Sequence, residues 1–298
     1  MISIVIPLYN KAQSIAGTLL GIQAQTVQDF EVVIVDGYST DGSLETVRRM
    51  AKEDPRIRVQ MQQNRRGVTP ARNESIAAAR SERIVFIDAD DIWEPGYLEK
   101  MLRLMDDFPE AGIWGLAYGA QEGEQRTGAG NQALNGFRGI LPRTWEYGCP
   151  YWTGATAISK AAFEAVGGFD NGIIFGEDID LWYRLMLRFP AAFDGTGTPL
   201  AWYRLDAENR ASARTYKPEI DIPFHIGKYA DARRADPAFR AFFDRQMLYR
   251  LWPYAGKREF RKPLRDALRQ IDFSLQKPSL RWRFVFPYFY KLHLRSKI

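Results

Sequence analysis

The first part of the chain alternates short apolar runs with stretches in which apolar residues recur at helical spacing. Residues 2–9 are almost entirely apolar and end at Asn10 and Lys11, which predicts a buried strand. Ile15, Leu19 and Ile22 then recur every three or four positions, before a second apolar run at 30–35. The pattern predicts a strand, a helix and a strand in succession.

The same alternation continues to residue 120. It predicts helices at 43–52, 69–79 and 95–108 and extended segments at 57–61, 83–87 and 112–120. Apolar strands separated by helices indicate an α/β fold with a mostly parallel, doubly wound sheet and helices on both faces. In such folds ligands bind outside the carboxyl ends of the strands.

The rest of the chain has a different pattern. Residues 123–139 are rich in Gly, Gln, Asn and Arg without periodicity, which predicts an exposed loop. Apolar residues recur at helical spacing from Phe239 to Leu251, which predicts a helical appendage. We therefore expect an α/β domain at 1–215 and a helical, basic-aromatic region at 216–298.

The composition is that of a folded protein, since 46% of the 298 residues are hydrophobic and 26% are charged. No apolar stretch approaches the roughly 18 residues that cross a bilayer, and no signal-peptide pattern follows Met1. We expect neither a membrane-spanning nor a secreted protein. A single cysteine, Cys149, and two histidines, His225 and His293, argue against a disulfide and a zinc cluster.

Three acidic motifs supply the candidate chemistry, and each also has a purely structural explanation. Asp88 and Asp90 would project to the same side of an extended chain, where Mg²⁺ or Mn²⁺ relieves their repulsion; the alternative is a solvated acidic turn. Asp36 opens a segment, 36–43, suited to a turn around a polar ligand or to a turn without one. Asp178 lies at the predicted start of a helix, where an ionised carboxylate acts as a general base or simply occupies an acidic first turn.

Two further segments accompany these motifs, SIVIPLYN at 3–10 and GVTPARN at 67–73. In this order the set resembles glycosyltransferase family 2, which has the GT-A fold, and the resemblance covers about residues 2–205. It implies that Asp178 is the catalytic base and that Asp90 with Asp88 holds the metal, Mn²⁺ or Mg²⁺. It also implies a nucleotide-sugar-binding set consisting of Pro7, Tyr9, Asn10, Asp36, Arg72, Asp88 and Ala89.

The sequence defines the acceptor and the nucleotide less well. Trp152 and Gly154 precede the base helix, and we expect them on the acceptor or donor-sugar side with Glu177 and Trp182; buried packing of Trp152 is an equal alternative. Many family members have two consecutive acids after the second strand, whereas Gly37 follows Asp36 here. The nucleotide base is therefore open, with UDP favoured over GDP and dTDP.

The resemblance implies a metal-dependent, inverting, hexosyl-type glycosyltransferase. It would transfer a sugar from a nucleotide-sugar donor to a hydroxyl of a glycan or lipid-linked acceptor, in surface polysaccharide biosynthesis. The alternative is a non-catalytic nucleotide-sugar-binding module of the same fold. That alternative predicts loss of the metal or base acids, yet Asp88, Asp90 and Asp178 are all present.

The C-terminal region has its own charge pattern. Residues 250–298 carry 13 Lys and Arg against 3 Asp and Glu, and aromatic and basic residues are interleaved from 281 to 297. This combination suits an anionic membrane surface, so we expect a cytoplasmic protein attached peripherally to the inner face of the membrane through 273–298. An RNA-binding tail is the competing account, although no nucleic acid partner is expected.

Overall fold

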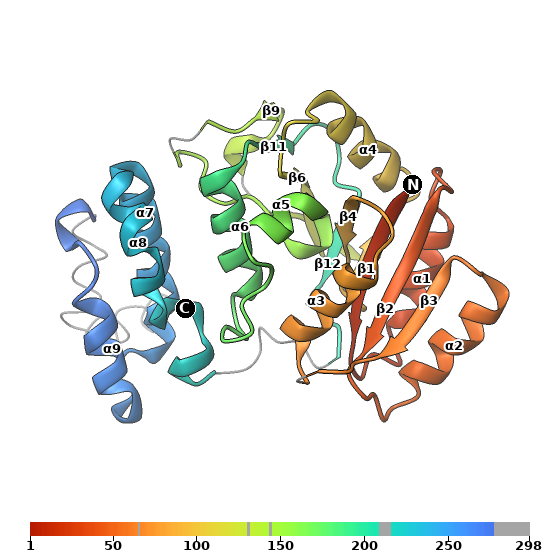
Figure 1. Ribbon diagram of the computed structural model, residues 1–298, viewed down its shortest axis with the longest axis horizontal. Coiled ribbons are helices and arrows are strands. Elements are labelled where there is room, and N and C mark those ends of the chain that lie inside the picture. Colours follow the sequence, from red (N-terminus) through yellow and green to blue (C-terminus); the bar gives the residue numbers. More distant parts are fainter. Residues whose placement is uncertain (65, 130–131, 143–144, 209–215, 277–298) are drawn as a thin grey trace. The chain divides into compact units, whose positions relative to one another are not determined.

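The computed structural model describes residues 1–64, 66–129, 132–142, 145–208 and 216–276. The chain divides into two compact units. Unit 1 comprises Met1–Arg143 and Cys149–Arg214, and unit 2 comprises Thr144–Gly148 and Thr215–Ile298. In the described residues both β-sheets belong to unit 1, whereas unit 2 is helical (Figure 1).

Eight strands among the described residues of unit 1 form a main sheet in the order β3-β2-β1-β4-β10-β6-β11-β9. Six run in one direction, and β9 and β10 run antiparallel to their neighbours. The predicted mostly parallel sheet is thus confirmed. The strands are β1 (Ile2–Leu8), β2 (Phe30–Asp36), β3 (Ile57–Met61), β4 (Arg83–Phe86), β6 (Ile113–Leu116), β9 (Arg138–Ile140), β10 (Thr156–Ser159) and β11 (Ala191–Asp194).

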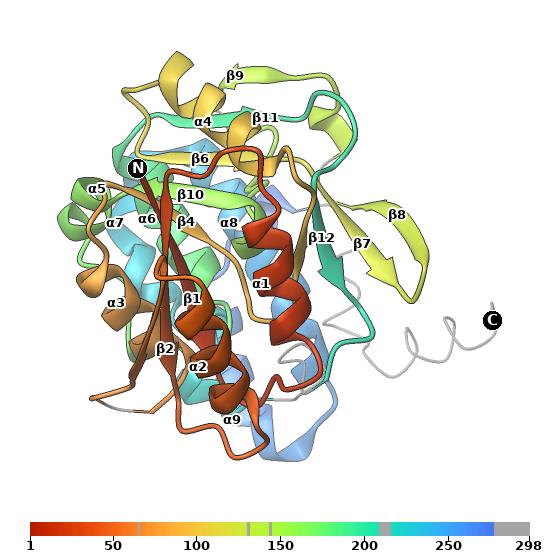
Figure 2. The ribbon, with the colours of Figure 1, turned by 90° about the vertical axis from the view of Figure 1, so that its right-hand side faces the viewer.

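Helices cover both faces of the main sheet, because side chains alternate along its buried strands. Ile2, Ile4 and Ile6 of β1 share one core cluster with apolar residues of α1, α2 and α4. On the opposite face Phe86 of β4 contacts the ring of Trp182 edge-to-face at 5.5 Å. On the same face α3 packs on β1 and β2 (Figure 2). The helices are α1 (Ile15–Gln23), α2 (Ser43–Glu53), α3 (Val68–Ala78), α4 (Tyr97–Asp107), α5 (Lys160–Ala165) and α6 (Glu177–Arg188).

A second, four-stranded sheet in the order β5-β12-β7-β8 lies beside the main one (Figure 2). It consists of β5 (Ile92–Trp93), β7 (Tyr118–Glu122), β8 (Gln125–Ala129) and β12 (Ala201–Arg204). The extended segment predicted at 112–120 is confirmed, and it divides at Ala117 into β6 and β7, which join different sheets. The loop predicted at 123–139 is partly wrong, since β8 pairs with β7 and β9 pairs with β11.

Unit 2 contains α7 (Ala230–Ala235), α8 (Pro237–Leu251) and α9 (Arg261–Leu268). The spacing of apolar residues from 239 to 251 correctly predicted α8, which buries Phe239, Phe243 and Met247. Asp236 caps this helix by accepting the N–H groups of Ala238 and Phe239 at 2.8 and 2.9 Å. Across the part of the chain that the structure describes, every helix is too short or too polar to span a bilayer.

Candidate active site

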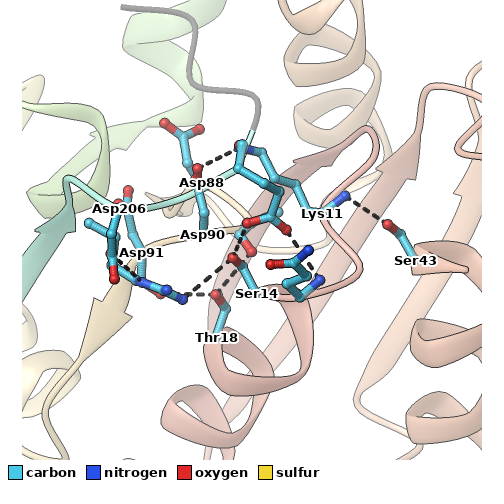
Figure 3. Close-up of polar contacts among 12 residues, drawn as sticks. Lys11, Ser14, Thr18, Ser43, Asp88, Asp90, Asp91 and Asp206 are labelled. Atoms are coloured by element: carbon cyan, nitrogen blue, oxygen red, sulfur yellow. Dashed lines mark hydrogen bonds and ion pairs between the residues drawn. The ribbon is translucent and has the colours of Figure 1, made fainter. Parts of the chain in front are cut away.

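The carboxyl ends of β1, β2 and β4 bring polar residues to one edge of the main sheet. Leu8 pairs in register with Asp36, and the N–H of Gly37 donates to the carbonyl of Leu8 at 2.7 Å. The loop after β4 is held against α1 by Thr18, whose hydroxyl lies 3.1 Å from the carbonyl of Ala89 and 2.9 Å from that of Asp91 (Figure 3). The three strand exits therefore lie at the same edge of the sheet.

Asp36 is fully buried, and its carboxylate holds the turn that follows β2. Its Oδ2 accepts the N–H groups of Tyr38 and Ser39 at 2.9 and 3.0 Å. Its Oδ1 has no hydrogen-bond partner among the described residues, although it is buried. An acceptor atom at the predicted nucleotide position is thus not used by the turn itself.

The loop after β1 is tied to the same turn. The side-chain oxygen of Asn10 accepts the N–H of Thr40 at 2.9 Å, and the N–H of Asn10 donates to Ser39 Oγ at 3.0 Å. Tyr9 stands outside this bonding and is 57% exposed, which leaves an aromatic ring open beside the turn. Pro7, in β1, is half-buried. The predicted nucleotide-side residues from β1 and β2 are therefore neighbours.

The acidic segment after β4 is a turn rather than an extended chain, because the N–H of Asp91 donates to the carbonyl of Asp88 at 3.1 Å. Its first two acids face different cations. Asp88 pairs with Arg72 Nη2 at 2.7 Å, and Asp90 pairs with Lys11 Nζ at 2.6 Å. The expectation that the two carboxylates project together from an extended strand is corrected by this turn.

Burial and mutual repulsion dominate the electrostatics of this turn. Burial, reinforced by Asp88, raises the pKa of Asp90, and Lys11 opposes the rise. Asp91 is 1% exposed, and burial with Asp88 and Asp90 raises its pKa well above the usual range. The main-chain amide of Arg204 and the ammonium of Lys11 offset this only in part. A further positive charge at this position would relieve the repulsion.

A buried arginine links the acidic turn to helix α6. Arg72, on α3, is 4% exposed and also donates to Glu177 Oε1, at the first position of α6. Burial raises the pKa of Glu177 to about 7, and Arg72 opposes the rise. One guanidinium thus bridges Asp88 on the proposed donor side to Glu177, the residue before the predicted base.

Asp178 lies in the first turn of α6, which starts after Gly176 in the left-handed conformation at φ 77°. Its Oδ1 accepts the N–H of Ile179 at 2.8 Å, and its Oδ2 accepts the hydroxyl of Thr153 at 3.2 Å. The side chain is partly exposed. Two donors and a helix N-terminus therefore hold a solvent-accessible carboxylate in a defined orientation.

Trp182 is part of the core rather than of a sugar site. It is fully buried and contacts Phe86 and Phe169 edge-to-face at 5.5 and 6.4 Å. Lying four residues after Asp178, it belongs to the face of α6 that packs on the sheet. Its burial contradicts the expectation that it faces a sugar.

Trp152 lies within an aromatic cluster that is open in part to solvent. Its ring is 4.7 Å from Tyr118 of β7 and 5.6 Å from Tyr203 of β12. A side chain on Gly154 would clash with the ring of Trp152, and the carbonyl of Gly154 accepts Trp93 Nε1 at 2.7 Å. Because Thr153 lies between these two residues, the cluster directly adjoins the hydrogen bond to Asp178.

Three contributors were missed by the sequence reasoning. Thr153 donates to Asp178, and Tyr118 contacts the neighbouring Trp152, only because β7 and the segment before β10 meet in space. Lys11 gave a local signal, since a cation directly follows the β1 exit at Asn10. Its partner Asp90 is 79 residues away, a pairing that no local pattern reveals.

The comparison with known families identifies the chain. A model described as Glycosyl transferase family 2 matches residues 3–167, more than half of the sequence. This chain belongs to glycosyl transferase family 2. The match includes Asp36, Arg72 and the acidic turn, whereas Asp178 lies beyond its end.

Two relatives show what this family 2 glycosyltransferase is similar to. Putative glycosyltransferase EpsH of Bacillus subtilis (strain 168) is 40% identical over 106 residues, which cover 36% of this chain and 30% of EpsH. Succinoglycan biosynthesis protein ExoA of Rhizobium meliloti (strain 1021) is 33% identical over 193 residues, 61% of this chain and 57% of ExoA. The chain thus matches less than two thirds of the length of either relative.

A solved structure supports the fold. The crystal structure of S. aureus TarS 1-349 in complex with UDP-GlcNAc superposes with a TM-score of 0.75, covering 92% of this chain and 82% of TarS 1-349. The sequences are 17% identical, so the similarity concerns the fold. The GT-A architecture predicted for this family 2 glycosyltransferase is confirmed.

Proposed function

We propose that this chain transfers a sugar from a nucleotide-diphosphate sugar to a hydroxyl of a glycan or lipid-linked acceptor, with inversion at the anomeric carbon. One observation carries the proposal: Arg72 joins Asp88 of the acidic turn to Glu177, next to Asp178. A fixed carboxylate and the acidic turn are thereby held on one rigid framework. Such mutual positioning is what a direct displacement between two bound molecules requires.

The donor side is proposed at the exits of β1 and β2. The exposed ring of Tyr9 offers a surface to the base, and the unpaired Oδ1 of Asp36 offers an acceptor. UDP is favoured among the nucleotides, and the UDP-GlcNAc complex of TarS, which shares the fold, agrees with that choice. A hexosyl donor is the corresponding proposal for the sugar.

Mn²⁺ or Mg²⁺ fits the acidic turn. Asp90 already pairs with the ammonium of Lys11 at 2.6 Å. The side-chain ligands available in the turn are carboxylate oxygens, which hard cations prefer. Among the described residues no group of three or more His, Cys, Asp and Glu side chains could hold a metal. We propose Asp90 as the main ligand of the ion and Asp88, which pairs with Arg72 in this structure, as the second; the bound ion would neutralise charge on the departing diphosphate.

The reaction needs a single base from the protein. Asp178 accepts the proton of the acceptor hydroxyl as that oxygen attacks the anomeric carbon, and the bond to the diphosphate oxygen breaks with its electron pair. Thr153 and the N–H of Ile179 orient the carboxylate. Attack from the face opposite the leaving group inverts the anomeric configuration.

The acceptor side is proposed at the aromatic cluster of Tyr118, Trp152 and Tyr203. Aromatic faces pack against the C–H faces of sugar rings, and this cluster adjoins the bond between Thr153 and Asp178. The name of ExoA, a succinoglycan biosynthesis protein, suits a role in surface polysaccharide biosynthesis. Glu177 faces Arg72 instead and is proposed to act only through that pair.

The catalytic part is proposed to be the GT-A domain predicted at 1–215, because every candidate residue lies in unit 1. Peripheral attachment to an anionic membrane from the cytoplasmic side stays a prediction. Most of the segment predicted to carry it, 273–298, lies outside the described residues.

The test compares the intact protein with Asp178→Asn and Asp90→Asn. Sugar transfer from a panel of nucleotide sugars is measured with and without Mn²⁺. We expect metal-dependent turnover of one donor, and a 10²–10⁴-fold lower kcat in Asp178→Asn with donor affinity unchanged. Tight donor binding without turnover, unaffected by Asp178→Asn, would instead establish the non-catalytic binding module.

A further inference from the structure

Lys11 connects three segments at the proposed metal position (Figure 3). Its Nζ lies 2.6 Å from Asp90 Oδ2 and also donates to the main-chain carbonyl of Glu208, after β12. The side chains of Lys11 and Asp90 are each 13% exposed. The ammonium is therefore largely withdrawn from water and is bound by two oxygens from distant parts of the sequence.

The main chain at Lys11 is fixed, whereas its side chain has freedom to move. Its N–H donates to Ser43 Oγ at 2.7 Å, and Asp41 in turn accepts the N–H of Ser43 at 3.0 Å. Four rotatable bonds separate this anchor from the ammonium. The charge can thus move over several ångströms while the loop after β1 stays in place.

The segment carrying Glu208 has supports besides Lys11. The carboxylate of Glu208 accepts the hydroxyl of Ser14 at 2.6 Å and the N–H of Gln13 at 3.2 Å. Its carbonyl is consequently held near Asp90 by bonds that do not involve the ammonium. A carboxylate oxygen and a carbonyl oxygen that converge on one cation are ligands suited to Mg²⁺ or Mn²⁺.

We propose that Lys11 is a built-in competitor for the metal: its ammonium occupies the cation position between Asp90 and Glu208 until a donor is bound. This inference rests on the proposed function, because it assigns Asp90 to the metal. A divalent ion and an ammonium cannot share one carboxylate at close range without strong repulsion. The ion must therefore displace Lys11, and the diphosphate of the donor gives the displaced ammonium a new anionic partner.

The consequence is that metal binding depends on nucleotide. Without a donor, the ion must break the Lys11–Asp90 pair, and no diphosphate is present to receive the ammonium. With UDP present, the ion and the ammonium both have anionic partners. Lys11 is in this sense a positioning residue that couples metal and donor binding.

The experiment measures free Mn²⁺ by electron paramagnetic resonance while the full-length protein is titrated, with and without UDP. Lys11→Met keeps the length of the side chain and removes the competing charge. Lys52→Met, at an exposed position in the last turn of α2, removes the same charge elsewhere in unit 1. The double variant Lys11→Met, Asp90→Asn tests whether any gain in Mn²⁺ affinity requires Asp90. Thermal unfolding shows that each variant is folded.

We expect Lys11→Met to bind Mn²⁺ about tenfold more tightly than the natural protein without UDP, and to gain less affinity when UDP is added. Lys52→Met should match the natural protein, and the double variant should lose the gain. Equal Mn²⁺ affinity of Lys11→Met and the natural protein, or an equal gain in Lys52→Met, refutes the competition. If the proposed function fails, UDP has no effect on any form, yet the comparison without nucleotide still decides the role of Lys11.

Discussion

The surroundings of Glu177 oppose the ionisation of its carboxyl group. The carboxyl is 8% exposed, and burial raises its pKa from 4.5 to about 7 despite the facing guanidinium of Arg72. The pKa of Arg72 is also raised, although burial opposes the rise, because Asp88, Glu177 and Asp178 all attract it. The two partners have different surroundings. Arg72 has three anionic neighbours, whereas Glu177 has one cationic neighbour and is shielded from water.

The raised pKa of Glu177 predicts how the replacement Glu177→Gln changes the stability of the protein. A rise of about 2.5 pKa units corresponds to about 3 kcal/mol. Between pH 4.5 and 7 the folded protein binds more protons than the unfolded chain, so stability falls as pH rises through that range. Glutamine keeps a partner for Arg72 without a buried charge. We expect Glu177→Gln to be up to about 3 kcal/mol more stable than the natural protein at pH 8, and little changed at pH 4.5.

The assay is urea unfolding at pH 4.5, 6 and 8. Unfolding is monitored by hydrogen exchange in peptides of β1 and α6, which report on unit 1 alone. Glu164→Gln, at an exposed position of α5, is the matched control and should show the pH dependence of the natural protein. A Glu177→Gln protein that is less stable at pH 8, or that keeps the natural pH dependence, would show that the ionised pair stabilises the fold and that the burial argument is wrong.

Three other changes test separate parts of the molecule. Thr153→Val should lower kcat about tenfold without changing UDP affinity, because Asp178 loses one of its two donors; Thr153→Ser should restore it, and failure to do so would argue for a packing role. Trp152→Ala should raise the acceptor KM about three- to tenfold at constant donor KM, and an equal rise in both would contradict an acceptor role. Burial raises the pKa of Asp221 from 3.8 to about 6, so unit 2 should lose stability as pH rises from 4 to 6. Asp221→Asn should remove that loss and stabilise unit 2 by roughly 3 kcal/mol at pH 8, measured by hydrogen exchange in α8; an unchanged pH dependence would refute the assignment.

Much of the fold was predictable because central strands of the main sheet such as β1 and β2 are buried on both faces. A run such as Ile2 to Ile6 has few alternatives to a buried strand, and the helices α2 and α4 carry a clear apolar stripe. The second sheet was not predictable in this way. Its strands are short and partly polar, as in the hairpin of β7 and β8, so their pairing depends on tertiary contacts such as the fit of Trp202 against Gly119.

The candidate site was predictable only in part, for a related reason. Asp36 ends β2, Asp178 lies in the first turn of α6, and Asp90 lies in the short turn between β4 and β5, so sequence position implies location. The partners of these acids come from elsewhere in the chain. Lys11 meets Asp90 across 79 residues and Thr153 meets Asp178 across 25, and neither distance has a local signature. Trp182 shows the opposite error, since its place near Asp178 in sequence suggested a binding role that its burial excludes.

The division of the extended segment at Ala117 separates two kinds of surface that a sugar-transferring enzyme must combine. The nucleotide-side residues and the acidic turn follow strands of the main sheet, whereas Tyr118 and Tyr203 stand on strands of the smaller sheet. Exchanging the partly exposed residues Tyr118 and Tyr203 therefore changes the aromatic cluster while the main-sheet core keeps its packing. Under the proposed function, redirecting the protein to a new acceptor would require randomising only this four-stranded sheet, with the proposed donor side unchanged.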